Sequence, residues 1–143
     1  MVIAIIGENC TGKSTLAEKL KEDFGATVYT GKDYLRMAKN PAEAEAVFKK
    51  LLIQAVEGEN IIYIISEAEH LKLLPEKSFK ILVTADLEVI KERFAARMRG
   101  VLPPPVAAML ERNHGKFDSI QNDFHYTAAD GYAALCEKIR SFQ

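Results

Sequence analysis

The sequence has 143 residues, the length of a single domain with one core. Hydrophobic residues make up 48% and charged residues 27%, which excludes disordered, collagen-like and low-complexity classes. The 19 Lys and Arg against 20 Asp and Glu give a net charge of −1, so the chain lacks the overall positive field of a nonspecific nucleic-acid binder. We expect one compact domain spanning 1–143, with no nucleic-acid partner.

The longest apolar runs, Met1–Ile6 and Ile61–Ile65, are far shorter than the roughly 20 residues that cross a bilayer. The first run is also too short for a signal-peptide core and leads directly into Gly7. These features predict no membrane association and a cytoplasmic location. Cys10 and Cys136 have no metal-ligand or CxxC spacing, so we interpret them as unpaired thiols.

The first half of the chain alternates strand and helix patterns. A β-branched apolar run predicts a buried strand, helical spacing of apolar residues follows it, and Gly25 ends that pattern. A short strand, a helical stretch ended by Asn40-Pro41 and a longer amphipathic helix closed at Gly58 come next. The predicted segments are a strand at Val2–Ile6, a helix at Lys13–Phe24, a strand at Ala26–Tyr29, a helical stretch at Asp33–Ala38 and a helix containing Phe48–Val56.

The second half repeats this alternation. Strands are predicted at Ile61–Ile65, Phe79–Thr84 and Asn122–Tyr126, and helices at Leu87–Met98, from Pro105 to Gly115, and near the C-terminus up to Phe142. Ser66 with Glu69, and Thr127 with Asp130, have the spacing of capping boxes that begin helices. Five strands separated by helices require crossover connections. The pattern therefore predicts an α/β fold with a mostly parallel sheet covered on both faces.

The segment Gly7–Ser14 matches G-x-x-x-x-G-K-[ST] at every fixed position. It follows a predicted strand and opens a predicted helix, which is the context that a phosphate-binding loop requires. Backbone N–H groups and the helix N-terminus would surround a polyphosphate, Lys13 would reach its β and γ phosphates, and the Ser14 hydroxyl would bind Mg²⁺. The nucleotide-binding residues predicted in this region are Gly7, Asn9, Cys10, Thr11, Gly12, Lys13, Ser14 and Thr15.

The chain is too small for ABC and AAA-type ATPases, and it has neither the D-x-x-G nor the N-K-x-D string of small GTPases. With this loop and this size, the chain resembles the P-loop small-molecule kinases. That group contains nucleoside monophosphate, shikimate, gluconate and adenylylsulfate kinases. The resemblance implies a three-layer P-loop NTPase sandwich whose five parallel strands have the order 2-3-1-4-5. It also implies ATP as the phosphoryl donor and Mg²⁺ as the cofactor.

A second segment, Gly31–Arg36, is similar to the G-D-x-x-R pattern with which several of these kinases hold the acceptor, although Lys32 separates Gly31 from Asp33. Asp33 would orient or deprotonate an acceptor hydroxyl, and Arg36 would bind an anionic acceptor. The alternative is a helix-start acid paired with a solvated arginine.

The segment Ser66–His70 departs from the monophosphate kinases, which usually have a glycine-proline-arginine segment here. Glu67 would hold the magnesium water or contact the acceptor; equally, it is a first-turn acid on a capped helix.

The third segment, residues 91–116, is similar to the lid of these kinases. It carries six basic residues against two acidic ones, so the local positive charge of the chain lies here. We predict a lid at about 98–115, with Arg93 and Arg97 contacting the transferring phosphoryl group and Arg97 also binding the nucleotide. The alternative is a solvated basic helix end.

The sequence thus predicts transfer of the γ-phosphoryl group of Mg·ATP to a small acceptor, with a nucleotide or another anionic metabolite as the favoured class. Lys13, Asp33, Arg93 and Arg97 are the predicted catalytic residues. Asp33, Arg36 and Glu67 are the predicted acceptor-binding residues, and Ser14 is the predicted metal ligand. A nucleotide-binding regulatory module without useful catalysis is the alternative function.

Overall fold

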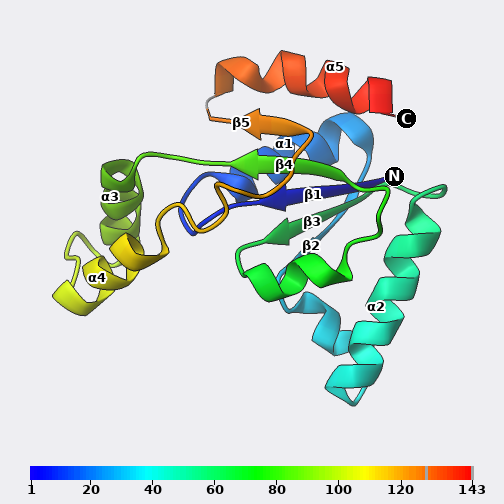
Figure 1. Cartoon of the computed structure of the whole chain (residues 1–143), viewed down its shortest axis with the longest axis horizontal. Coiled ribbons are helices and arrows are strands. Elements are labelled where there is room, and N and C mark those ends of the chain that lie inside the picture. Colours follow the sequence, from blue (N-terminus) through cyan, green and yellow to red (C-terminus); the bar gives the residue numbers. More distant parts are fainter. Residues whose placement is uncertain (128, 143) are drawn as a thin grey trace.

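Five parallel strands form one sheet in the order β2-β3-β1-β4-β5 (Figure 1). The computed structural model describes residues 1–127 and 129–142. The strands are β1 (Val2–Ile6), β2 (Thr27–Thr30), β3 (Ile61–Ile65), β4 (Phe79–Val83) and β5 (Phe124–Tyr126). The strand order and the parallel arrangement expected from the resemblance are therefore confirmed.

Strand β1 lies at the centre of the sheet, and all five of its residues are buried. Successive side chains of a strand point to opposite faces, so one set packs on each side. Ile3 and Ile5 belong to the core beneath α1 (Lys13–Phe24) and α5 (Tyr132–Phe142). Val2, Ala4 and Ile6 belong to the core beneath α2 (Pro41–Ala55). Helices cover both faces, as the sequence predicts (Figure 1).

Two further helices, α3 (Leu87–Arg97) and α4 (Pro104–Asn113), project beyond the carboxyl end of β4 (Figure 1). They pack on each other through a small apolar cluster that contains Ile90, Leu110 and Cys10 of the loop after β1. The α3–α4 pair thus rests on the predicted phosphate loop through side chains far apart in the sequence.

The described residues include no helix long and apolar enough to cross a membrane.

Three short segments form 3₁₀ helices: η1 (Asp33–Met37), η2 (Ala68–Leu73) and η3 (Ala129–Gly131). The capping box predicted at Ser66 is wrong, because the residue preceding η2 is Glu67 and no side chain caps it. The carbonyl oxygens of Ile64 and Ile65 accept hydrogen bonds from Gly31 and Gly7, and the chain stays extended through Glu67. These hydrogen bonds join segments far apart in the sequence, so a local sequence pattern could not predict them.

Several predicted boundaries also shift. Strand β2 begins one residue later than predicted, and β5 begins at Phe124 rather than Asn122. The Asn40 side chain accepts from the N–H groups of Ala42 and Glu43, so Asn40-Pro41 begins α2 as well as ending the preceding segment.

Helix α4 begins at Pro104, one residue before the predicted start, and ends at Asn113, before Gly115. The helix start predicted over Thr127 to Asp130 includes residue 128, which lies outside the described residues. The α-helix itself begins at Tyr132.

The first glycine of the motif has a packing role. A Cβ atom at Gly7 would overlap the carbonyl oxygen of Val83 at the end of β4. We predict that Gly7→Ala lowers the free energy of unfolding by about 1–3 kcal/mol, because the backbones of β1 and β4 would have to separate. Urea denaturation measures this loss. Gly131→Ala is the matched control, because a Cβ there meets nothing within 4 Å. Equal stability of Gly7→Ala and the parent would contradict this packing argument.

Candidate functional site

The loop between β1 and α1 turns sharply at two residues with positive φ. Cys10 has φ 62° and Gly12, which precedes the first helical residue, has φ 99°. Gly12 adopts the left-handed conformation that glycine tolerates best. The first turn of α1 contains no acidic residue, so the positive end of its dipole is available to an anion.

A cavity of about 130 Å³ opens at this helix N-terminus. The polar residues on its wall that the sequence predicts as part of the site are Asn9, Lys13, Ser14, Thr15 and Arg97. Thr30, at the end of β2, and Ser66, just after β3, also line it, and the sequence analysis missed both. Both residues lie at the carboxyl ends of neighbouring parallel strands, and this position could have indicated that they belong to the site. The other lining residues are Cys10, Gly12 and Ile64.

Lys13 is only 6% exposed, although it is the first residue of α1. Its Nζ donates a hydrogen bond to the backbone carbonyl oxygen of Glu8. Burial lowers the pKa of Lys13 to about 8, with Lys116 and Arg97 adding to this effect while Cys10 and Glu8 oppose it. A desolvated ammonium group with one neutral partner would bind strongly to a charged acceptor such as phosphate.

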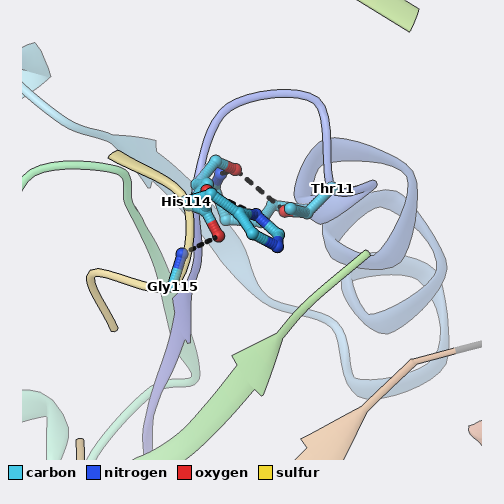
Figure 2. Close-up of polar contacts among 5 residues, drawn as sticks. Thr11, His114 and Gly115 are labelled. Atoms are coloured by element: carbon cyan, nitrogen blue, oxygen red, sulfur yellow. Dashed lines mark hydrogen bonds and ion pairs between the residues drawn. The ribbon is translucent and has the colours of Figure 1, made fainter. Parts of the chain in front are cut away.

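Thr11 stabilises the loop by a hydrogen bond to another loop residue. Its Oγ1 donates to the Glu8 carbonyl oxygen at 2.9 Å, so this oxygen receives hydrogen bonds from both Thr11 and Lys13. Figure 2 shows Thr11 in this arrangement. Thr11 is buried and does not line the 130 Å³ cavity, but it lines a neighbouring cavity of about 480 Å³.

The two predicted lid arginines take different positions. Arg93 Nη1 donates to the carbonyl oxygen of Cys10 at 3.0 Å, so Arg93 holds the loop backbone. Arg97 is exposed and lines the 130 Å³ cavity. Both also line the 480 Å³ cavity, which continues past Thr15 and Lys19 to Tyr126. Arg97 therefore stands at the boundary between two adjoining spaces.

The segment after β2 follows Thr30, which lines the 130 Å³ cavity. Asp33 Oδ2 accepts a hydrogen bond from the N–H of Thr30 at 2.9 Å, which places Asp33 beside the cavity wall. Arg36 follows three residues later on η1 and is exposed. Residues three apart are eclipsed on a 3₁₀ helix, so Asp33 and Arg36 share one face, as the sequence predicts for a helix.

The segment after β3 adds negative charge to the same side. Ligand atoms of Glu67, Glu69 and His70 lie within 4.8 Å of one another, and Glu67 directly follows Ser66 of the cavity wall. Burial raises the pKa of Tyr63, and the nearby Tyr34 hydroxyl and the carboxylates of Asp33, Glu67 and Glu69 raise it further. Three carboxylates thus lie around the ends of β2 and β3.

His70 lies beside these carboxylates and is buried. The residue is 3% exposed, its Nδ1 has no hydrogen-bond partner among the described residues, and its Nε2 lies 3.8 Å from Oε1 of Glu69.

Solved structures share this fold. A protein from Eubacterium ventriosum ATCC 27560 superposes with TM-score 0.71 at 16% identity, covering 99% of both chains. A shikimate kinase from Bacteroides thetaiotaomicron gives TM-score 0.61 at 11% identity, covering 99% of this chain and 97% of that one. A deoxyadenosine kinase from M. mycoides gives 0.58 at 16%, covering 99% and 100%. No family model matches the sequence, and a search of curated proteins finds no match. The chain thus has the fold of P-loop small-molecule kinases.

The burial of Lys13 predicts a dependence of stability on pH. The unfolded chain holds the lysine proton up to about pH 10.5, whereas the folded chain releases it near pH 8. The free energy of unfolding should therefore rise between these values, by up to about 3 kcal/mol, because the unfolded state binds more protons there. Lys13→Met should lack this rise.

Urea denaturation across that pH range measures the slope for each variant. Lys21→Met, an exposed lysine in the last turn of the same helix, is the control and should keep the parental slope. Identical slopes for Lys13→Met and the parent would contradict the burial of a titrating ammonium group.

Proposed function

We propose that the chain transfers the γ-phosphoryl group of Mg·ATP to a small acceptor. One observation carries this proposal: Lys13, Ser14 and Arg97 meet at a helix N-terminus in one cavity. The wall of the same cavity includes Thr30 and Ser66, which adjoin Asp33 and Glu67. Cationic groups and backbone N–H groups on one side suit a polyphosphate. A carboxylate on the other side suits an acceptor hydroxyl. This division is what phosphoryl transfer between two ligands requires.

The donor would occupy the two adjoining cavities. Its β and γ phosphates fit the 130 Å³ cavity at Lys13, and its nucleoside fits the 480 Å³ cavity beyond Thr15, a volume within the range of small-molecule sites. Arg97 lines both cavities and could contact phosphate oxygens at their boundary.

The oxygen atoms around Ser14 suit Mg²⁺. The Ser14 hydroxyl is exposed on the cavity wall, Ser66 lines the same wall, and the Glu67 carboxylate directly follows it. Mg²⁺ prefers oxygen ligands and usually binds through few protein groups plus the phosphates. When bound, the ion neutralises charge on the β and γ phosphates.

The remaining roles belong to side chains already described. The Lys13 ammonium group would leave the Glu8 carbonyl oxygen and bind a phosphate oxygen instead. Together with Arg97, it would stabilise charge on the transferring phosphoryl group. Asp33 would orient the acceptor hydroxyl and accept its proton. Arg36 favours an anionic acceptor, including a nucleotide, whereas the carboxylates of Glu67 and Glu69 on the same side favour an uncharged one. The acceptor test must therefore include both kinds.

Residues 98–115 would act as the lid. Arg99 and Gly100 both have positive φ just after α3, and they separate it from α4. Such a turn can absorb a change in backbone angles while α4 moves as a unit. A covered site would limit the loss of ATP to water.

A regulatory nucleotide-binding module is the second candidate. The observation that favours it is the acidic segment Glu67–His70, which stands where monophosphate kinases have an acceptor-binding arginine. This module would bind Mg·ATP in the same cavities without transferring its phosphoryl group at a useful rate.

Acceptor-dependent release of ADP tests the proposal and separates the two candidates. The purified chain with Mg·ATP is assayed against paired acceptors: nucleosides with their monophosphates, and neutral polyols with their carboxylate analogues. We expect one pair member to raise ADP release at least about 10²-fold above the rate without acceptor.

The matched variants assign the two sides of the site. Lys13→Ala should lose most Mg·ATP affinity in a calorimetric titration. Asp33→Asn should keep that affinity and lower turnover by about 10² or more, because its amide cannot accept the acceptor proton. Tight Mg·ATP binding without acceptor-dependent ADP release would favour the regulatory module. Undiminished binding by Lys13→Ala would contradict both candidates.

A further inference from the structure

An acidic residue stands inside the loop that would bind polyphosphate. Glu8 is the first residue after Gly7, and its side chain is only 10% exposed. The Glu8 carboxylate interacts electrostatically with the ammonium group of Lys13, which would hold the phosphates. It would therefore also repel bound phosphates, and the repulsion is stronger where water is excluded. The charge of Glu8 must therefore be compensated in any state that binds phosphate tightly.

The segment just after α4 provides that compensation. Glu8 Oε2 accepts a hydrogen bond from the backbone N–H of Gly115 at 3.1 Å. Glu8 Oε1 lies 3.2 Å from Nδ1 of His114. Figure 2 shows His114 and Gly115 beside the loop, with a dashed line for the hydrogen bond that Gly115 donates. Both carboxylate oxygens thus face the C-terminal end of the proposed lid.

The backbone of the same residue holds the phosphate-binding lysine. The Glu8 carbonyl oxygen accepts from Lys13 and Thr11, so a shift of Glu8 changes the position of Lys13 as well. The α3–α4 pair has a second contact with this loop, because Arg93 within α3 donates to the carbonyl oxygen of Cys10. The helical pair is therefore bound to one short loop at two points, through Arg93 of α3 and through the segment just after α4.

The compensating contact is also able to open. His114 is 38% exposed, and a cavity of about 610 Å³ lies beside Glu8, lined also by Arg93, His114 and Asp118. If residues 114–115 moved away, the Glu8 carboxylate would lose both partners while it still interacts with Lys13, and Asp118 would be a further negative charge on the same 610 Å³ cavity.

We propose that Glu8 is a positioning residue that couples docking of the lid end to phosphate affinity. This inference rests on the proposed binding of Mg·ATP at the loop. With His114 and Gly115 docked, the charge of Glu8 is compensated and its carbonyl holds Lys13 ready for the phosphates. With that end undocked, the free carboxylate opposes polyphosphate binding.

A pair of substitutions tests this coupling. His114→Ala removes one partner and leaves the charge, so we expect Mg·ATP to bind roughly three- to tenfold more weakly by calorimetry. Glu8→Gln keeps an oxygen for the Gly115 N–H but carries no charge. Added to His114→Ala, it should restore affinity to the parental value or above. A purely structural contact would instead make the double variant as weak as His114→Ala or weaker.

Two controls make the outcome decisive. His125→Ala alters another histidine of the same 610 Å³ cavity, one that contacts Thr84 and not Glu8, and should bind Mg·ATP as the parent does. Hydrogen exchange of the nucleotide-free chain should increase over residues 105–117 in His114→Ala but not in His125→Ala.

The two proposals fail in different ways. A double variant that stays as weak as His114→Ala, or exchange that does not change over residues 105–117, would overturn the coupling. If the parent itself does not bind Mg·ATP, the proposed function fails, and the exchange experiment alone decides whether Glu8 holds the lid end.

Discussion

The buried hydrogen bond from Lys13 to the Glu8 carbonyl determines how the other parts of this site work together. Desolvation makes the ammonium group costly to leave without a strong partner, and a neutral carbonyl is a weak one. Arg97 and Lys116 add positive charge near this ammonium group, and the first turn of α1 carries no acidic residue. The loop is therefore held in a shape that an anion would stabilise further.

The sequence predicts the central part of the fold because local and long-range requirements agree there. The apolar run of β1, the motif and the stripe of α1 each have a single reasonable interpretation, and their bounds match the structure. Elsewhere long-range bonds decide. The carbonyls of Ile64 and Ile65 accept hydrogen bonds from neighbouring segments, and η2 begins only after Glu67. Arg93, although exposed, donates to a loop carbonyl 83 residues away. Glu8 occupies a variable position of the motif, so no pattern could assign it a partner at residues 114–115.

The segments around the 130 Å³ cavity differ in charge, and this difference bears on the acceptor. The loop side collects cations, whereas Asp33, Glu67 and Glu69 surround the ends of β2 and β3. Arg36 is the group that led the sequence analysis to favour an anionic acceptor, yet it is exposed on η1. The arrangement supports phosphoryl transfer in general more firmly than it supports any one acceptor class, because charge on the acceptor side is mixed.

The central claim is that phosphate replaces the Glu8 carbonyl as the partner of Lys13. A crystal structure of the chain with Mg²⁺ and a nonhydrolysable ATP analogue tests it most directly. The account predicts that Lys13 Nζ lies within about 3 Å of a β or γ phosphate oxygen and no longer contacts Glu8, while Gly115 still donates to the Glu8 carboxylate. A complex in which Lys13 remains on the Glu8 carbonyl while the analogue binds elsewhere would contradict it.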